Sequence, residues 1–430
     1  MKTIKLFFGL ILASTVLFQS CTQTDESIDS IVIEGDTINN DNGGGDTPPP
    51  ATNDVVILQG SITANTTLES SKTYELKGGV TVESGATLTI QAGTKIIAGN
   101  ENGVFAFLLI AQGAKIQAIG TASQPIVFTS KNATPNAGDW GGLLLAGKAP
   151  INRGLTATSE VANATYGGTD PLDNSGTLSY VRLEFTGGKI NADSEFNGLS
   201  LYGVGSATTI DHIQVFQGND DGFEFFGGTV NTKYLVSVGA KDDLFDWTDG
   251  WIGKNQFWVG LQTSIEGDRG IEADNLSSNR LATPISNPAI ANITLVGAED
   301  GDGGNQAMKL REGTQVKIFN AIAKGFAKRG VQVEHDETIT QLNDGKLTVE
   351  WSIIDNVNPF VYTGTAATAT VDFLDPSFNN STGPVTLTQS VFGTVPTTFN
   401  PSTLDPFFSN APFIGAVSAD DNWMAGWVRF

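Results

Sequence analysis

Residues 218–228 read GNDDGFEFFGG, and the core of this stretch returns along the chain every 22 to 26 residues in most cases. The shared template is a polar residue, a small or apolar residue, an apolar residue, a polar residue and an apolar residue. Self-similarity at such a period is the signature of a repeat architecture. The copies are NGLSL (197–201), DGFEF (221–225), DLFDW (243–247), RGIEA (269–273), QAMKL (306–310) and RGVQV (329–333).

A second strand-like run precedes most copies, as at residues 213–215 and 236–238. One coil of a parallel β-helix holds two or three short strands and takes about this many residues. We therefore predict an all-β fold, a parallel β-helix, with a β-sandwich followed by a shorter solenoid as the alternative. The one long step, from residue 270 to residue 307, predicts a coil with an inserted loop at about 273–287. Residues 80–90 and 108–116 repeat with a longer period and predict coils with larger turns.

The N-terminus is typical of a bacterial lipoprotein. Lys2 and Lys5 precede an apolar run too short to span a bilayer, and Cys21 is the only cysteine. We expect a signal peptide at 1–20 and a lipidated Cys21 that anchors the mature chain in the outer membrane. Residues 21–53 are rich in Gly, Pro, Asp and Asn and predict a flexible tether. The β-helix domain is then expected at 54–430.

The formal net charge of −22 excludes nucleic acid as an expected partner, because the chain would repel a polyanion. A polyanionic substrate would need bound cations or a local basic patch. A solenoid must also hide its open end, and the closing Trp423 and Trp427 are expected to fold back as that cap.

Several longer motifs resemble a family of secreted or lipidated right-handed β-helix proteins of Bacteroidota. The resemblance implies a right-handed β-helix at the cell surface, and members often accompany TonB-dependent transport systems. It implies no established reaction. The motifs are GDWGGLLLAG (138–147), YGGTD (166–170), DNSG (173–176), GVGS (203–206), IDHIQV (210–215), FGGTV (226–230) and DNWMAGW (421–427).

If the coils stack in register, acidic side chains form a column on the outer surface. Like charges so close raise one another's pKa unless something neutralises them. Three interpretations stay open: a Ca²⁺ site, the cleft of a glycan-cleaving enzyme, or turn-capping residues with a structural role. The candidate metal ligands are Asp220, Asp221, Glu224, Asp242, Asp243, Asp246, Asp268 and Glu272.

The enzyme hypothesis needs particular partners within that column. Asp221 and Asp243, on adjacent coils, could supply the acid and the base of an inverting hydrolase. A polysaccharide lyase would instead need a basic residue near Ca²⁺, and Lys309 and Arg311 lie in the right series of coils. The chain has only two histidines and one cysteine, so we expect no zinc or haem site.

The alternation of the template predicts that Phe223 and Phe225 point inward. Trp251 leaves the template and is a candidate exposed platform for a sugar ring. The sequence therefore predicts a surface lipoprotein whose acidic β-helix face binds a glycan or an envelope protein such as a TonB-dependent transporter, with Ca²⁺ as a possible cofactor. The alternative is a polysaccharide lyase or glycoside hydrolase.

Overall fold

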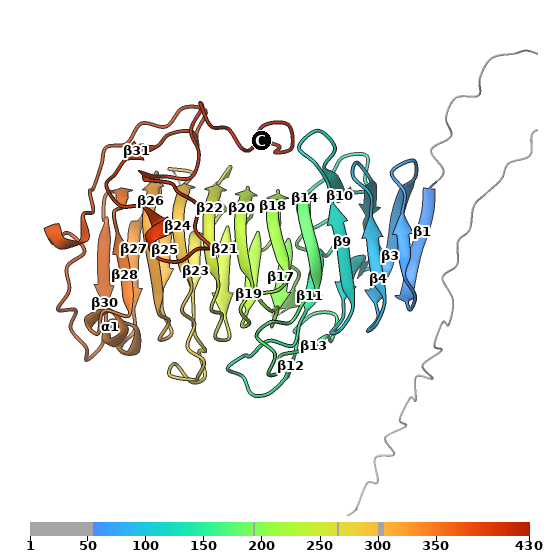
Figure 1. The fold of residues 1–430 in the computed structure, drawn as a ribbon, viewed down its shortest axis with the longest axis horizontal. Coiled ribbons are helices and arrows are strands. Elements are labelled where there is room, and N and C mark those ends of the chain that lie inside the picture. Colours follow the sequence, from blue (N-terminus) through green and yellow to red (C-terminus); the bar gives the residue numbers. More distant parts are fainter. Residues whose placement is uncertain (1–54, 192–193, 265, 300–304) are drawn as a thin grey trace, which may run out of the picture.

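The computed structural model describes residues 55–191, 194–264, 266–299 and 305–430, which form a solenoid of stacked coils (Figure 1). One wrapped sheet of 24 strands runs the length of the molecule, and its strands pair in parallel. The fold is a right-handed parallel β-helix, which confirms the prediction, and the β-sandwich alternative is wrong. The expected signal peptide, tether and Cys21 lie outside the described residues.

The first part of the solenoid contains β1 (Val55–Ile62), β2 (Thr66–Leu68), β3 (Thr73–Val82), β4 (Thr87–Ile90), β5 (Lys95–Ala98), β6 (Asn100–Glu101), β7 (Val104–Phe105), β8 (Phe107–Ile110), β9 (Lys115–Ile119), β10 (Ile126–Ser130), β11 (Leu143–Ala146), β12 (Ala157–Thr158) and β13 (Thr165–Tyr166). The central part contains β14 (Gly176–Glu184), β15 (Lys189–Asn191), β16 (Ser194–Glu195), β17 (Leu199–Tyr202), β18 (Thr209–Phe216), β19 (Phe223–Phe226), β20 (Asn231–Val238), β21 (Phe245–Thr248), β22 (Lys254–Leu261), β23 (Arg269–Ala273) and β24 (Ala289–Val296). The last part contains β25 (Gln306–Leu310), β26 (Val316–Lys324), β27 (Arg329–Glu334), α1 (Asp336–Asn343), β28 (Leu347–Glu350), β29 (Ile353–Asp355), β30 (Phe360–Thr363), β31 (Val395–Pro396) and β32 (Phe413–Ile414), with 3₁₀ turns at Pro376–Phe378 and Pro401–Thr403.

The coils present three faces. Face A consists of the stacked strands β8, β11, β17, β19, β21, β23, β25, β27 and β30. Each long strand of the central coils, such as β18 and β20, is bent and supplies both face B and face C. The ladder of β18 and β20 skips one residue pair at this bend, between Asp211↔Lys233 and Ile213↔Leu235.

The bend between faces B and C has a single cause that recurs in successive coils. The residue at the bend has a positive φ, which turns the chain without a loop. Four of these residues stack their rings on the outside of the solenoid, with centroid distances of 4.2, 4.3 and 4.9 Å. The stacking offsets the strain of the left-handed conformation. The bend residues are Tyr180, His212, Tyr234, Phe257, Asn292, Asn320 and Trp351.

Aromatic side chains fill the core beneath face A. Phe223 and Phe225 point inward and are fully buried, as the template predicts. Phe223 stacks on Phe245 of the next coil at 5.5 Å, and Phe245 stacks on Trp258 at 4.4 Å. Because neighbouring coils share these rings, the core fixes the register in which the outer side chains of face A lie.

The C-terminal segment does not close the open end of the solenoid, so the expected role of Trp423 and Trp427 is wrong. Figure 1 shows this segment running back along the side of the coils. Trp427 is fully buried and meets the ring of Tyr180 edge-on. The last coil is covered instead by apolar residues of α1 and of the segment after β30, which join the main core: Ile339, Leu342 and Phe373.

Two insertions leave the coils after strands of face A. Residues 147–175 follow β11, and residues 274–288 follow β23, which confirms the predicted inserted loop. The insertions touch, because Asn152 donates a hydrogen bond of 2.7 Å to Asn275. In the part of the chain that the structure describes, no helix has the length and apolar character needed to cross a membrane.

Candidate functional site

Face A carries the predicted acidic column in register. The strand pairings place Glu224 opposite Asp246, and Asp246 opposite Glu272. Ser200 precedes this series and Lys309 follows it. We call the following eight residues the acidic ladder: Asp220, Asp221, Glu224, Asp242, Asp243, Asp246, Asp268 and Glu272.

The turn before β19 explains why glycine follows Asp221. A Cβ on Gly222 would lie 2.2 Å from the Ser237 hydroxyl and 2.6 Å from the Leu244 carbonyl, so only glycine fits there. Asp221 caps the adjoining turn, because its Oδ1 accepts a hydrogen bond of 2.9 Å from the backbone N–H of Asp243. Turn capping therefore accounts for one oxygen of Asp221, and the other carboxylates need a further explanation.

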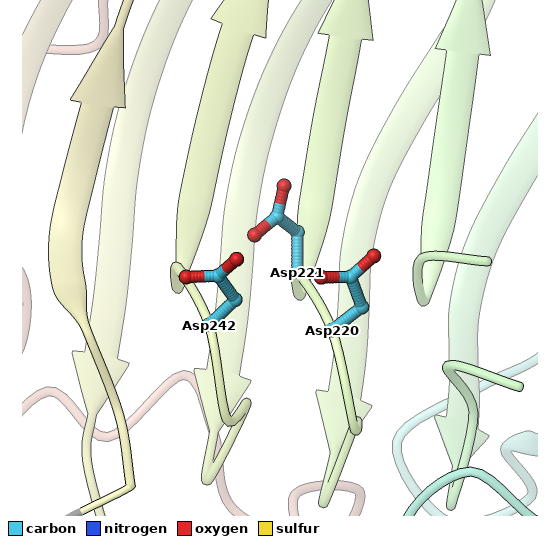
Figure 2. A group of neighbouring side chains, drawn as sticks. All are labelled: Asp220, Asp221 and Asp242. Atoms are coloured by element: carbon cyan, nitrogen blue, oxygen red, sulfur yellow. The ribbon is translucent and has the colours of Figure 1, made fainter. Parts of the chain in front are cut away.

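The carboxylates form four overlapping groups of three, and within each group one oxygen per residue lies within 4.8 Å of the others. Figure 2 shows Asp220 and Asp242 at corresponding turns of neighbouring coils, with Asp221 beside them. We call the two groups between β19 and β21 the first rung and the two groups between β21 and β23 the second rung. The first rung comprises Asp220, Asp221, Glu224, Asp242 and Asp246; the second comprises Asp242, Asp243, Asp246, Asp268 and Glu272.

Several ladder oxygens are buried without a hydrogen-bond partner among the described residues. Asp243 is only 2% exposed, and its Oδ1 accepts no hydrogen bond from them. Oδ1 of Asp246 is likewise buried and has no partner among them. Buried polar atoms in native proteins are nearly always satisfied, so unpaired carboxylate oxygens point to a missing partner.

Burial and mutual repulsion change the acidity of the ladder. Burial, followed by the charge of Asp242, raises the pKa of Asp220 to about 8. Burial, followed by the charge of Asp268, raises the pKa of Asp242 to about 6. Burial is also the largest cause that raises the pKa of the deeper carboxyl groups, which are Asp221, Glu224, Asp243, Asp246 and Glu272.

The two rungs differ in how their charge is balanced. Arg269 forms ion pairs in the second rung, and Arg311 adds a contact to Glu272. In the first rung, Asp220, Asp221 and Glu224 form no ion pair with any described residue, and neither do Asp242 and Asp246. Asn197, which the template places in line with Asp221, donates a hydrogen bond to Glu224 but brings no charge. The first rung therefore gathers negative charge without a direct ion pair among the described residues, and the charge of Arg269 acts on Asp242 only from a distance.

The residues proposed for catalysis are less favourably placed. Lys309 pairs with Glu334 at 3.2 Å, and Arg311 pairs with Asp274 at 2.8 Å. After burial, the charge of Asp274 is the largest influence on Arg311 and raises its pKa, which opposes a role as a base. Asp221 and Asp243 are both buried. In the group of Asp220, Asp221 and Asp242, Asp221 is buried, whereas Asp220 and Asp242 keep contact with solvent.

Trp251 is not a sugar-binding platform, and the expectation that it is exposed is wrong. The side chain is fully buried and stacks on Phe225 at a centroid distance of 3.9 Å. Its indole N–H donates to the carbonyl of Val230. Trp251 leaves the template because the chain turns inward after β21, where the ring fills the space between two coils.

Sequence reasoning missed several residues beside the ladder. Asp249 is fully buried and binds Arg153, whose Nε lies 2.7 Å from Oδ1, and the hydroxyl of Tyr166. Arg153, Glu160 and Tyr166 belong to the insertion 147–175, and burial raises the pKa of Glu160. No repeat signal could place these residues, because the insertion lies outside the template.

Comparisons with known proteins identify the family. A sequence profile of the pectate-lyase-like β-helix domain matches residues 60–428. The chain belongs to this family. Among solved structures, this pectate-lyase-like β-helix domain is similar to the enzymatically active domain of tailspike protein 2 of bacteriophage CBA120. The two are 14% identical with a TM-score of 0.28, and the match covers 68% of this chain and 39% of the tailspike chain. A search among curated proteins found no match.

Proposed function

We propose that the acidic ladder binds Ca²⁺ at its first rung and that the bound cation attaches face A to an acidic polysaccharide. The observation that carries this proposal is the first rung. Within each of its two groups, one oxygen of every carboxylate lies within 4.8 Å of the others, and no basic side chain of the described residues forms an ion pair with them.

The chemistry of the rung suits Ca²⁺. This hard cation takes six to eight oxygen ligands at about 2.3–2.6 Å and accepts carboxylates in one-oxygen or two-oxygen contacts. Neither group of the first rung contains a histidine or a cysteine, which zinc prefers. A divalent cation would also supply the partner that Oδ1 of Asp246 lacks among the described residues. Without a cation, burial and mutual repulsion raise the pKa of Asp220 to about 8 and also raise the pKa of Asp246.

The rung reaches solvent at Asp220 and Asp242, so a cation held there could take further ligands from outside the protein. The strongly acidic chain would repel a polyuronate, and a Ca²⁺ ion that both share removes that repulsion. Family membership supports a polysaccharide ligand, because the family takes its name from pectate lyases.

Titration calorimetry tests the cation, with protein stripped by EDTA and then titrated with Ca²⁺. We expect saturable binding to the wild type and none to Asp221→Asn, with Asp420→Asn as the matched control, since Asp420 is exposed and belongs to none of the four groups. Retention on immobilised polygalacturonate then tests the glycan. Retention should require Ca²⁺ and should exceed retention on a neutral glucan. The absence of Ca²⁺ binding contradicts the proposal, and equal retention on both glycans contradicts its second half.

Family membership also supports a second candidate, cleavage of the bound polysaccharide. Incubation with a polyuronate should then release unsaturated or reducing ends, and Asp220→Asn should remove that activity because Asp220 is a protonatable, accessible acid. Lys309→Ala tests the lyase version separately. Binding without any released ends would leave the non-catalytic function.

We further propose that the domain acts at the cell surface, anchored through Cys21 to the outer membrane, beside a TonB-dependent transporter. The apolar run before the only cysteine supports the anchor. Cys21→Ser should move the protein from the membrane fraction to the soluble fraction and prevent labelling with palmitate. Crosslinking on intact cells, followed by mass spectrometry, should recover the transporter; recovery of no membrane protein contradicts the partnership.

A further inference from the structure

The charge at the first position of the template changes sign between successive coils of face A. The first template position carries Asn197, Asp221, Asp243 and then Arg269 in successive coils. The backbone hydrogen bonds between coils continue through these positions. The N–H of Gly222 donates to the carbonyl of Asp243, and the N–H of Leu244 donates to the carbonyl of Arg269. Arg269 therefore stands where the repeat would place a third aspartate.

The guanidinium of Arg269 lies within the second rung. A single atom, Nη1, contacts three of its carboxylates, at 3.4 Å (Asp243), 2.6 Å (Asp268) and 3.0 Å (Glu272). These carboxylates belong to both groups of that rung. The arginine side chain is mostly buried, so the positive charge is held among the carboxylates and does not extend into solvent.

On the basis of the proposed Ca²⁺ function, we infer that Arg269 is a resident counter-ion that fills the second rung and confines the divalent cation to the first. A guanidinium and a Ca²⁺ ion cannot share the same carboxylate oxygens, because both charge and volume would overlap. The second rung thus already holds a positive charge supplied by the chain itself, although Oδ1 of Asp243 accepts no hydrogen bond from the described residues. The first rung has the same design of stacked carboxylates without such a group among the described residues.

Arg311 offers a comparison within the same face. It also reaches back by one coil, to Glu272, and it pairs with Asp274 in addition. Asp274 belongs to none of the four groups. Removal of Arg311 would therefore leave Arg269 in place and would not open a set of three convergent carboxylates. Removal of Arg269 would open the group of Asp242, Asp243 and Asp268.

The stoichiometry of Ca²⁺ binding tests this inference, measured by titration calorimetry and by equilibrium dialysis with radioactive Ca²⁺. We expect one bound ion in the wild type, two in Arg269→Met, and one in Arg311→Met. The double variant Arg269→Met with Asp268→Asn should return to one. If Arg269→Met fails to fold, as judged by circular dichroism, Arg269→Gln replaces it, and Arg269→Lys, which keeps the positive charge, should bind one ion.

Each outcome distinguishes the inference from the function on which it rests. An unchanged count of one ion in the folded Arg269 variants overturns the inference and leaves the Ca²⁺ function intact. A second bound ion in Arg311→Met also overturns the inference, because removal of Arg269 would then have no effect that is specific to it. A wild type that binds no Ca²⁺ overturns the proposed function, whatever the variants show.

Discussion

Replacement of Asp221 by asparagine should have opposite effects on stability with and without Ca²⁺. Asp221 is 6% exposed and lies among four other carboxylates of the first rung, with no basic partner among the described residues. Asparagine has the same shape, and its amide oxygen can still accept the hydrogen bond from the backbone of Asp243. The substitution thus removes one negative charge and leaves the turn intact.

The expected gain in EDTA follows from the charges. Two unit charges about 5 Å apart repel by roughly 3 kcal/mol at an effective dielectric constant near 20. Protonation of Asp221 would relieve this repulsion, but a raised pKa itself costs stability at pH 8, because the unfolded carboxyl is ionised there. Whether Asp221 is ionised or protonated in the folded wild type, the asparagine variant avoids the corresponding loss of stability. For a domain of this size about 1 °C of melting temperature corresponds to each kcal/mol, so we expect a rise of about 3–4 °C.

In Ca²⁺ the order should reverse. A ligand at about 1,000 times its dissociation constant stabilises the folded state by about 4.1 kcal/mol, which exceeds the roughly 3 kcal/mol that the variant gains in EDTA. The variant should bind no Ca²⁺ and should therefore gain none of this stabilisation. Differential scanning calorimetry at pH 8, in EDTA and in excess Ca²⁺, measures both effects, and Asp420→Asn serves as the control of equal charge change. A variant that is less stable than the wild type in EDTA would refute the reasoning, because Asp221 would then be a structural cap.

Three further predictions concern pH and packing. Because the pKa of Asp220 is about 8 and that of Asp242 about 6, both above the unfolded value near 4, the folded chain holds more protons, so the melting temperature in EDTA should fall as pH rises from about 4 to about 8. Excess Ca²⁺ should remove most of this fall, and a flat profile in EDTA contradicts the repulsion. Trp251→Ala should lower the free energy of unfolding by about 3–5 kcal/mol in denaturant titrations, because it empties a fully buried site; a loss below about 1 kcal/mol would show that the core adapts. Trp427→Ala should make the C-terminal segment sensitive to limited proteolysis while Ca²⁺ binding persists, since Trp427 packs on Tyr180 at the bend between faces B and C, whereas the acidic ladder lies on face A. An unchanged digestion pattern would contradict the idea that Trp427 holds the C-terminal segment against the coils.

The repeat and its register could be predicted from the sequence. The template alternates with a period of two, so Phe223 and Phe225 had to face one way and Glu224 the other. Equivalent template positions align when coils stack, and this alignment alone predicts that Glu224, Asp246 and Glu272 lie in one line, as the strand pairings confirm. The inserted loop was visible as the one long step between copies.

The charge balance of the ladder could not be predicted in this way. Arg269 occupies a template position, yet nothing in the alternation shows that its long side chain reaches back to Asp243. The same holds for Arg153, which pairs with Asp249 across 96 residues of sequence. Long side chains and inserted loops take their direction from packing against distant segments, so their contacts are decided outside the repeat.

The sequence by itself determined the coil, the inward aromatic residues and the outward acidic residues, because these depend on alternation and turn glycines within about 25 residues. Only the tertiary structure decided that Trp251 lies in the core, that Trp427 lies along the flank, and that the first rung has no counter-ion among the described residues while the second has Arg269. Each of these outcomes depends on which surfaces come into contact when the coils stack and the terminal segment folds back. The contacting residues are far apart in the sequence, so no local pattern predicts these contacts.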